Sequence, residues 1–264
     1  MTKNIIYVSS YPKSGATWLQ FLIFCCYNGP FKSSKEVLRF YPPSNRNKLI
    51  EKNNHNPLFI KSHAAHSRQI SLLDDNARCI LLVRHPLDIG HSLINHHKNQ
   101  GSLRLLLPYF QNKFLMTFLN ENKSNENTSW NYHSASWLKQ KQFPLHIIRY
   151  DDLITQPIPI LAHLRNVYEL EFTDKDIANA VDLCSIEKMK ALEKKELDQK
   201  IAGLFYSRRR KLTKRLLKSS FVNKGGTLDH QTKFTESYLN NAADIFNPML
   251  KELDFKLISK TGNK

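Results

Sequence analysis

The sequence predicts an α/β fold: a single domain whose central, mostly parallel sheet is flanked by helices. Short, nearly continuous apolar runs alternate along the chain with longer segments of helical patterning. Strands that are apolar throughout are covered on both faces, and strands that alternate with helices are joined by crossovers into parallel sheets. The chain shows no internal repeat, and its 264 residues can bury a sizeable core.

The expected elements follow one another along the chain. Four runs rich in β-branched and other apolar residues predict strands, at Ile5–Ser9, Leu58–Lys61, Cys79–Val83 and His146–Arg149. Helical patterning covers Thr17–Tyr27, Pro86–His97, Trp130–Gln142 and Ile158–Tyr168, and an amphipathic stretch runs from Phe172 to Lys200. Because ligands bind at the carboxyl ends of strands in such sheets, we expect the functional residues directly after the strands.

Charge narrows the class of ligand. Apolar residues make up 41% of the chain and charged residues 23%, as in ordinary globular proteins. Lysine and arginine number 39 against 23 acidic residues, a net charge of +16. Such an excess attracts nucleotides, nucleic acid, anionic lipid or other phosphorylated and sulfated molecules, and does not choose among them.

The four cysteines indicate a reducing compartment. Cys25, Cys26, Cys79 and Cys184 show no CxxC spacing, which argues against a disulfide framework or a zinc site and favours buried thiols. The N-terminus lacks the features of a signal peptide. The longest apolar patch is about half the length that spans a bilayer. We therefore expect a cytoplasmic protein without a transmembrane segment, for which peripheral membrane contact stays open.

The turn after the first predicted strand has the properties of an anion site. Residues 10–18 read SYPKSGATW. The first N–H groups of a helix are unpaired, and together with the helix dipole they attract anions. Gly15 permits close backbone approach, Lys13 supplies a charge, and Ser14 and Thr17 supply hydroxyl groups. The stretch is not GxxxxGK[ST], which disfavours an ordinary magnesium-dependent ATP or GTP site.

A histidine and a lysine follow the second predicted strand, in FIKSHAAH at residues 59–66. Lys61 and His63 are two residues apart and project on the same side of an extended segment. A histidine in this place could act as a general base near neutral pH. The alternative is an ordinary surface or capped histidine.

An arginine ends the third predicted strand, in LVRHPLDIGHS at residues 82–92. The fork of Arg84, with Ser92 on the following helix, suits a second phosphate group. Pro86 is acceptable in the first helical turn, and Asp88 is favourable there through the helix dipole. A capping arrangement with an exposed arginine is the alternative.

Glycines and a basic run lie late in the chain. In FVNKGGT at residues 221–227, Gly225 and Gly226 can form an anion nest beside Lys224, or simply a hinge. The preceding residues 207–220 carry seven basic side chains and no acidic one. They form either a solvated basic helix face or a lid that closes over a polyanion.

Taken together, these segments resemble the signature of the sulfotransferases that use 3′-phosphoadenosine 5′-phosphosulfate (PAPS). YPKSGATW resembles the family's 5′-phosphosulfate loop, and IKSH at 60–63 resembles the strand end that carries its catalytic histidine. Arg84 and Ser92, in R-x-P-x-D-x-x-x-S form, resemble its 3′-phosphate motif, and FVNKGG resembles its closing segment. WNYHSASW at 130–137 and IRYDDL at 148–153 also match, so the resemblance covers nearly the whole chain in family order.

The resemblance implies a fold like that of P-loop NTPases and a role for each matching residue. Lys13 would touch the bridging oxygen between the 5′-phosphate and the sulfuryl group. His63 would be the general base and Lys61 its electrostatic partner; His133 would lie near the acceptor, with a purely structural histidine as the alternative. The donor would be held by Lys13, Ser14, Gly15, Ala16, Thr17, Trp18, Arg84, Ser92, Tyr150, Ser185, Asn223, Lys224 and Gly225.

Several positions depart from the family pattern. Ala16 stands where threonine is usual, Asn223 where arginine is usual, and His230 where tryptophan is usual. Cys184 and Ile186 replace a typical threonine and phenylalanine. These departures bear on the affinity for the donor more than on its identity, and the neighbouring residues Arg208 to Lys211 could compensate. The role of the whole basic run Arg208–Lys218 stays open.

The predicted activity is transfer of a sulfuryl group from PAPS to a hydroxyl or amine of a small-molecule or glycan/lipid acceptor, without a metal. Residues of about 98–129 would shape the acceptor side, and about 200–230 would form the basic lid and closing segment. A P-loop-type nucleotide kinase, a basic nucleic-acid-binding protein and a donor-binding protein without catalysis are the alternatives. Under the favoured interpretation no nucleic-acid partner is expected.

Overall fold

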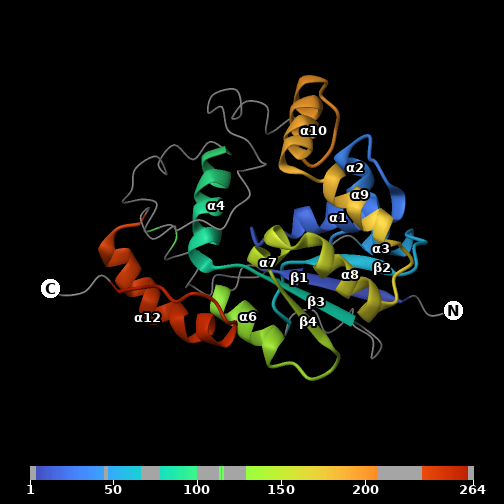
Figure 1. The fold of residues 1–264 in the computed structure, drawn as a ribbon. Coiled ribbons are helices and arrows are strands. Elements are labelled where there is room, and N and C mark those ends of the chain that lie inside the picture. Colours follow the sequence, from blue (N-terminus) through green and yellow to red (C-terminus); the bar gives the residue numbers. More distant parts are fainter. Residues whose placement is uncertain are drawn as a thin grey trace.

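The computed structural model describes residues 4–44, 47–66, 78–99, 113, 115, 129–206 and 234–260. Its centre is a four-stranded, all-parallel sheet with the strand order β2-β1-β3-β4 (Figure 1). The strands are β1 (Ile5–Ser10), β2 (Leu58–Ser62), β3 (Arg78–Val83) and β4 (Leu145–Arg149). Each end lies within one residue of the predicted one, and the predicted α/β class is confirmed.

The register of the sheet brings the carboxyl ends of the strands together. Ser9 of β1 lies opposite Ser62 of β2, and Val83 of β3 lies opposite Arg149 of β4. Ser10 of β1 lies opposite Leu82 of β3. The residues that follow the four strands therefore emerge along one edge of the sheet.

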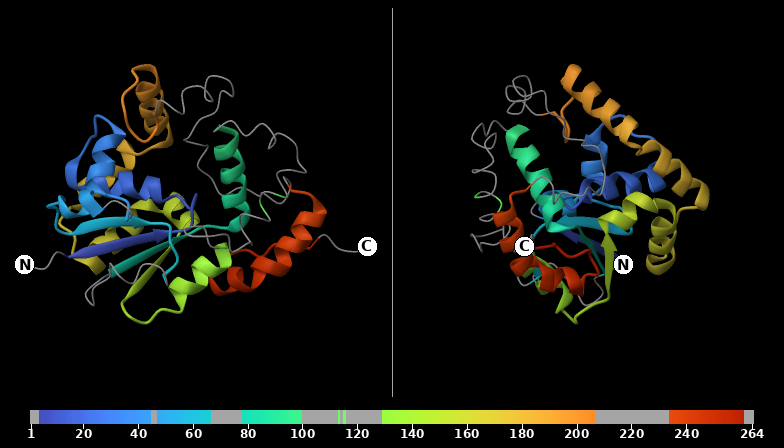
Figure 2. Two further views of the ribbon diagram at one scale, coloured as in Figure 1. Left: turned by 180° about the vertical axis from the view of Figure 1, so that it is seen from behind. Right: turned by 60° about the vertical axis from the view of Figure 1, so that its left-hand side comes forward.

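Helices cover both faces, as Figures 1 and 2 show. One face is covered by α1 (Ala16–Asn28), α2 (Ser34–Phe40), α7 (Tyr150–Thr155), α8 (Pro157–Tyr168), α9 (Asp174–Leu183) and α10 (Ile186–Asp198). The other is covered by α4 (Pro86–Asn99), α6 (Trp130–Leu138) and α12 (Glu236–Glu252). The short α3 (Asn47–Glu51) precedes β2. Within the described ranges, no helix is both long and apolar enough to cross a membrane.

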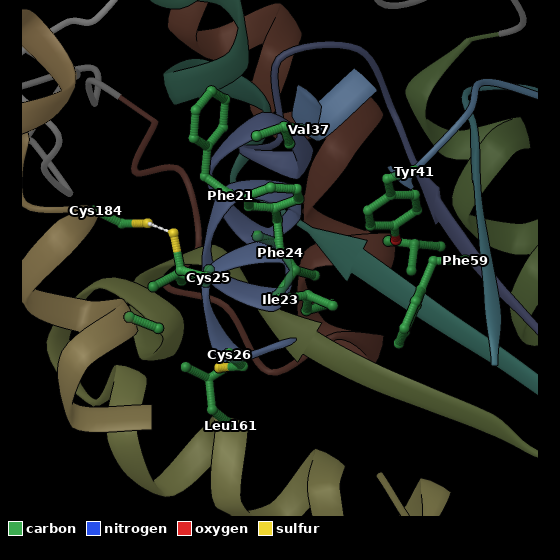
Figure 3. Packing of buried hydrophobic residues seen from close by; sticks show 14 of the residues in the cluster. Phe21, Ile23, Phe24, Cys25, Cys26, Val37, Tyr41, Phe59, Leu161 and Cys184 are labelled. Carbon is green, nitrogen blue, oxygen red and sulfur yellow. Dashed lines mark hydrogen bonds between the residues drawn. The ribbon is translucent and has the colours of Figure 1, made fainter. Parts of the chain in front are cut away.

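The core consists of two apolar layers, one on each side of the sheet. In β1, Ile6 and Val8 pack into the α1 layer, whereas Tyr7 packs into the α4 layer. This alternation with burial on both sides is why β1 has a continuous apolar sequence, whereas the edge strand β4 is only partly buried. The α1 layer is seen from close by in Figure 3, where the sulfur atoms of Cys25 and Cys184 face each other at 3.6 Å. All four cysteines are buried and free, as predicted.

Two predicted helices have different limits. The helix from Trp130 ends at Leu138 instead of Gln142, because the side-chain oxygen of Gln140 accepts hydrogen bonds from the backbone of Gln142 and Phe143 and forms a turn. The stretch Phe172–Lys200 is two helices, α9 and α10, since Ser185 caps a new helix start.

Several predicted functional segments lie outside the described residues. They are Asn223, Lys224, Gly225 and His230, the basic run Arg208–Lys218, and most of the region 98–129.

Candidate functional site

The turn between β1 and α1 has an unusual backbone. Lys13 has φ +73°, a left-handed conformation that non-glycine residues rarely adopt, and Gly15, the N-cap of α1, has φ +97°. A Cβ atom at Gly15 would lie 2.4 Å from Cδ2 of Tyr150, so glycine is required there for packing as well as for its φ angle. Backbone strain of this kind persists where the surroundings hold it, often at functional sites.

The hydroxyl group of Ser14 fits an anion at this turn. Ser14 is 1% exposed, and its Oγ has no hydrogen-bond partner among the described residues. A buried hydroxyl without a partner costs free energy. Since Ser14 directly precedes Gly15, the N-cap of α1, a phosphate oxygen bound by the first N–H groups of the helix would satisfy it.

Arg84, directly after β3, is fixed on three sides. Its Nη1 donates to the carbonyl oxygen of Lys13 at 3.2 Å, and its Nε lies 3.8 Å from Oδ2 of Asp88. Its guanidinium carbon lies 4.1 Å from the ring centroid of Tyr150, which makes a cation–π pair. Arg84 therefore connects the β1–α1 turn with the residue that follows β4. Ser92, on α4, is buried.

Trp18 and the α9–α10 junction lie together. The indole Nε1 of Trp18 donates to the carbonyl oxygen of Cys184 at 2.9 Å. Ser185 is the next residue, and its hydroxyl accepts from the backbone N–H of Lys188 as the N-cap of α10. Trp18 and Ser185, which are far apart in the sequence, thus lie close together in the fold.

His63, directly after β2, is bound to the end of β1. Its Nδ1 lies 2.7 Å from the carbonyl oxygen of Ser10 and 3.3 Å from the hydroxyl of the same residue. Because a carbonyl oxygen only accepts, Nδ1 carries the hydrogen and Nε2 is the basic nitrogen. Burial and the positive charges of Lys61 and Lys13 lower the pKa of His63 to about 3, although the bond to Ser10 opposes this shift. The ring is therefore neutral near pH 7.

Lys61, the fourth residue of β2, is held by a buried amide. Its Nζ lies 3.4 Å from Oε1 of Gln20, whose Nε2 in turn donates to the carbonyl oxygen of Tyr41. The second bond fixes the orientation of the Gln20 amide. Burial lowers the pKa of Lys61 to about 8. Gln20 was not singled out from the sequence, although a glutamine within the apolar run of α1 was a usable signal.

His133, on α6, lies beside His63. It is 1% exposed, its Nε2 lies 3.5 Å from the hydroxyl of Ser9, and its ring meets that of Tyr11 edge-on with centroids 5.7 Å apart. Burial and the proximity of His63 lower the pKa of His133 to about 3. His133 is thus a neutral, packed side chain at the carboxyl edge of the sheet.

Comparison with known proteins decides the family. The family model described as "Sulfotransferase domain" matches residues 3–254. The chain belongs to the sulfotransferase family.

This sulfotransferase-family chain is similar to flavonol 3-sulfotransferase of Flaveria bidentis, with 26% identity over 208 residues that cover 72% of this chain. They cover only 66% of the plant protein, slightly less than two thirds of its length. Sulfotransferase 1B1 of Canis lupus familiaris is 26% identical over 247 residues, 87% of this chain and 78% of that protein. The crystal structure of mouse sulfotransferase SULT7A1 complexed with PAP has the same fold, with a TM-score of 0.68 and 19% identity over 96% of this chain and 87% of that chain.

The structure brings together the described members of the predicted sulfotransferase motifs. Lys13, Ser14, Gly15, Ala16 and Thr17 form the turn and helix start after β1, and His63, Arg84 and Tyr150 directly follow β2, β3 and β4. Ala16 is 3% exposed and packs into the core. Sequence reasoning missed the anchoring role of the Ser10 carbonyl and the ion pair from Asp88 to Arg84. The spacing of four residues between Arg84 and Asp88 across a helix start was the available signal.

Proposed function

We propose that this sulfotransferase-family protein transfers a sulfuryl group from PAPS to a hydroxyl or amine of a small molecule. One observation carries the proposal: Arg84 and His63 are both bonded to backbone carbonyls of the segment Ser10–Lys13, from opposite sides of β1. In this proposal the phosphate-binding group and the proton acceptor are both anchored to the same short segment of backbone. The mouse relative crystallised with PAP supports a nucleotide of this class.

The residues present fit a doubly phosphorylated nucleotide. The buried hydroxyl of Ser14, at the positive end of α1, suits the 5′-phosphate. Arg84, fixed by Asp88 and Tyr150, suits the 3′-phosphate as a planar fork. In this assignment the donor is held by Lys13, Ser14, Gly15, Ala16 and Thr17 at the 5′ end, by Arg84, Ser92, Asn223, Lys224 and Gly225 at the 3′ end, and by Trp18, Tyr150 and Ser185 around adenine.

The proposed chemistry is an in-line displacement. Nε2 of His63 accepts the proton of the acceptor hydroxyl as its oxygen forms the new bond to sulfur. The bond from sulfur to the bridging phosphate oxygen breaks, and that oxygen keeps the electron pair. Lys13 stabilises this charge, and Lys61 interacts with the sulfuryl oxygens. Holding the two reactants in line supplies much of the rate enhancement.

The negative charge of a bound donor would change the pKa of His63, the proposed base. Two of the groups that lower the pKa of His63 are the cations Lys61 and Lys13. An anionic ligand bound between these cations offsets their charge, which raises the pKa of His63 toward its ordinary value. The histidine thereby becomes a better proton acceptor when the donor is in place.

The proposed acceptor is a small alcohol or phenol. His133 is near enough to His63 for the two to interact electrostatically, and Tyr11 packs edge-on against His133. One relative is named for sulfation of a flavonol. We further propose that residues 1–264 form a single domain, that about 98–129 shape the acceptor side, that about 200–230 close over the donor, and that the protein acts in the cytoplasm.

Titration calorimetry with adenosine 3′,5′-bisphosphate (PAP) tests the donor assignment, and transfer of label from radioactive PAPS to a panel of phenols and alcohols tests the reaction. We expect PAP to bind without magnesium and at least one acceptor to be labelled. Failure to bind PAP, or turnover of ATP that requires magnesium, would contradict the proposal.

A further inference from the structure

The segment that follows α12 runs back to the edge of the sheet where the candidate site lies (Figures 1 and 2). We call residues 253–258 the α12 strap. The backbone N–H of Phe255 donates to the carbonyl oxygen of Leu250 at 2.8 Å. Asn247 holds Ile258 through two hydrogen bonds, of 2.8 and 3.0 Å. The strap is therefore fixed on α12 at both of its ends.

One contact of the strap is with His85. The Nε2 of His85 donates to the carbonyl oxygen of Lys256 at 3.1 Å, and its Nδ1 accepts from the backbone N–H of Leu87 at 3.3 Å. Its ring meets that of Phe255 edge-on at 6.0 Å. Burial, together with the charges of Arg84 and Lys256, lowers the pKa of His85 to about 4. His85 is a neutral ring that caps α4 with one nitrogen and binds the strap with the other.

A second contact is with Arg149, at the end of β4. Its guanidinium donates to the carbonyl oxygen of Asp254 and lies 3.1 Å from the carboxylate of the same residue. The guanidinium carbon lies 5.8 Å from the ring centroid of Phe255. Two further bonds, of 2.7 and 3.1 Å, join Arg149 to Asp152 at the start of α7. The strap thus binds the ends of both β3 and β4.

His85 and Arg149 are the chain neighbours of Arg84 and Tyr150, the two members of the cation–π pair. We infer that the α12 strap positions this pair, and that His85 is a positioning residue for recognition of the nucleotide 3′-phosphate. The inference rests on the proposed function, in which Arg84 binds that phosphate. Beyond Val83 and Arg149 the ladder between β3 and β4 has ended, so the strap bridges two strand ends that the sheet no longer holds. A fork that binds phosphate loses affinity when its orientation is loose.

His85→Asn separates the two contacts of this residue. The oxygen of asparagine takes the place of Nδ1 and can still accept from the N–H of Leu87, and asparagine is among the best N-cap residues. The shorter side chain does not reach the carbonyl oxygen of Lys256. The variant therefore keeps the cap of α4 and loses only the bond to the strap.

Two further variants complete the set. Asp254→Asn removes the charge that pairs with Arg149, and asparagine tolerates the left-handed φ of +54° at this position. Lys260→Ala is the matched control, since it removes an ion pair between the chain beyond the strap and Asp244 of α12 and leaves the contacts of His85 and Arg149 in place.

The quantity to measure is the ratio of the affinities for PAP and for adenosine 5′-monophosphate, which lacks the 3′-phosphate. Calorimetry on the full chain gives both affinities, and the melting temperature shows whether each variant is folded. We expect His85→Asn to lower this ratio by about fivefold, as for one weakened charged hydrogen bond, and Asp254→Asn to lower it less. Lys260→Ala should leave it unchanged. If His85→Asn and Asp254→Asn fold and keep the wild-type ratio of affinities, while the wild type binds PAP, the positioning role of the strap and His85 is wrong and the proposed function still stands. Absence of PAP binding by the wild type would overturn the proposed function and this inference with it.

Discussion

The Nδ1 atom of His63 lies 2.7 Å from the carbonyl oxygen of Ser10, so the end of β1 fixes the histidine that follows β2. This bond decides which ring nitrogen carries hydrogen and leaves Nε2 as the proton acceptor. The same strand continues into the turn that contains Lys13 and Gly15. One strand end thus orients the proposed base and forms the turn that we propose binds the donor.

Removal of the imidazole separates catalysis from binding. We expect His63→Ala to lower the turnover of labelled PAPS by about 10²–10⁴-fold, the range of general base catalysis. The affinity for PAP should stay close to that of the wild type. The control is His163→Ala, which removes an exposed histidine of α8 and should change neither the turnover nor the affinity for PAP. Wild-type turnover in His63→Ala would exclude the histidine as the base.

Gly15 and Gly29 offer a matched pair of substitutions. Both have positive φ, +97° and +68°, but a Cβ at Gly15 meets Tyr150 at 2.4 Å, whereas a Cβ at Gly29 meets nothing within 4 Å. Gly29→Ala should cost about 1 kcal/mol of unfolding free energy through its backbone alone. Gly15→Ala should cost about 1–3 kcal/mol more, because overpacking adds to the strain.

Donor binding distinguishes the two glycine variants further. Gly15→Ala displaces the ring on which Arg84 stacks, so its affinity for PAP should fall, and that of Gly29→Ala should not. Chemical denaturation and calorimetry measure the two effects. Equal losses in both variants would show that the contact with Tyr150 is unimportant.

Arg84→Lys tests the fork and not merely the charge. Lysine keeps a positive charge but cannot form two parallel bonds to a phosphate or stack on Tyr150 as a plane. We expect the free energy of PAP binding to weaken by about 1.5–3 kcal/mol, the contribution of a charged hydrogen bond. Arg165→Lys, in an exposed pair with Asp174, is the control. If Arg84→Lys binds PAP about as tightly as the wild type, only the positive charge of Arg84 matters and the fork does not.

Acid should destabilise the protein before its carboxylates titrate. Burial is the first cause that lowers the pKa values of His63 and His133 to about 3 and of His85 to about 4. The unfolded chain protonates these rings near pH 6.5, so the stability that they contribute is complete above that pH and is lost as the pH falls toward their folded values.

The size of this acid effect can be measured ring by ring. At about pH 5 each buried histidine should lower the unfolding free energy by at most about 2 kcal/mol relative to neutral pH. Urea denaturation at pH 5 and pH 7.5 measures the difference, and His85→Asn should reduce it. A pH-independent stability between these values would contradict the buried, neutral state of the rings.

The strands, and the edge of the sheet at which the candidate site lies, could be predicted because both follow from local patterns in the sequence. β1, β2 and β3 are mostly buried on both faces, whereas the edge strand β4 is only partly buried. The topology of a parallel sheet places the residues after the strands at one edge. The limits of the helices were harder to predict. The apolar pattern continues across Cys184 and Ser185, where a serine cap starts a new helix. No helix was predicted for Glu236–Glu252, which form one helix of 17 residues although Pro248 lies inside it.

The anchoring contacts could not be predicted from the sequence. The bonds from His63 to Ser10, from Lys61 to Gln20 and from Trp18 to Cys184 join residues between 41 and 166 positions apart. They depend on how strands and helices lie against one another in space. A single unusual residue, such as the glutamine in the apolar run of α1, marks one member of a pair but does not show which distant residue it contacts.

Because all four thiols are buried, their reaction with alkylating reagents reports when the packed core around them opens. Cys25 and Cys26 lie on α1, Cys79 lies on β3 and Cys184 ends α9, with exposed fractions of 0–4%. Alkylating reagents reach them only when the surrounding layer separates, and burial raises the pKa of Cys26 to about 12, which slows the reaction further. Mass spectrometry of labelled peptides would then time the exposure of the sheet and of the helices beside it separately, without an added probe.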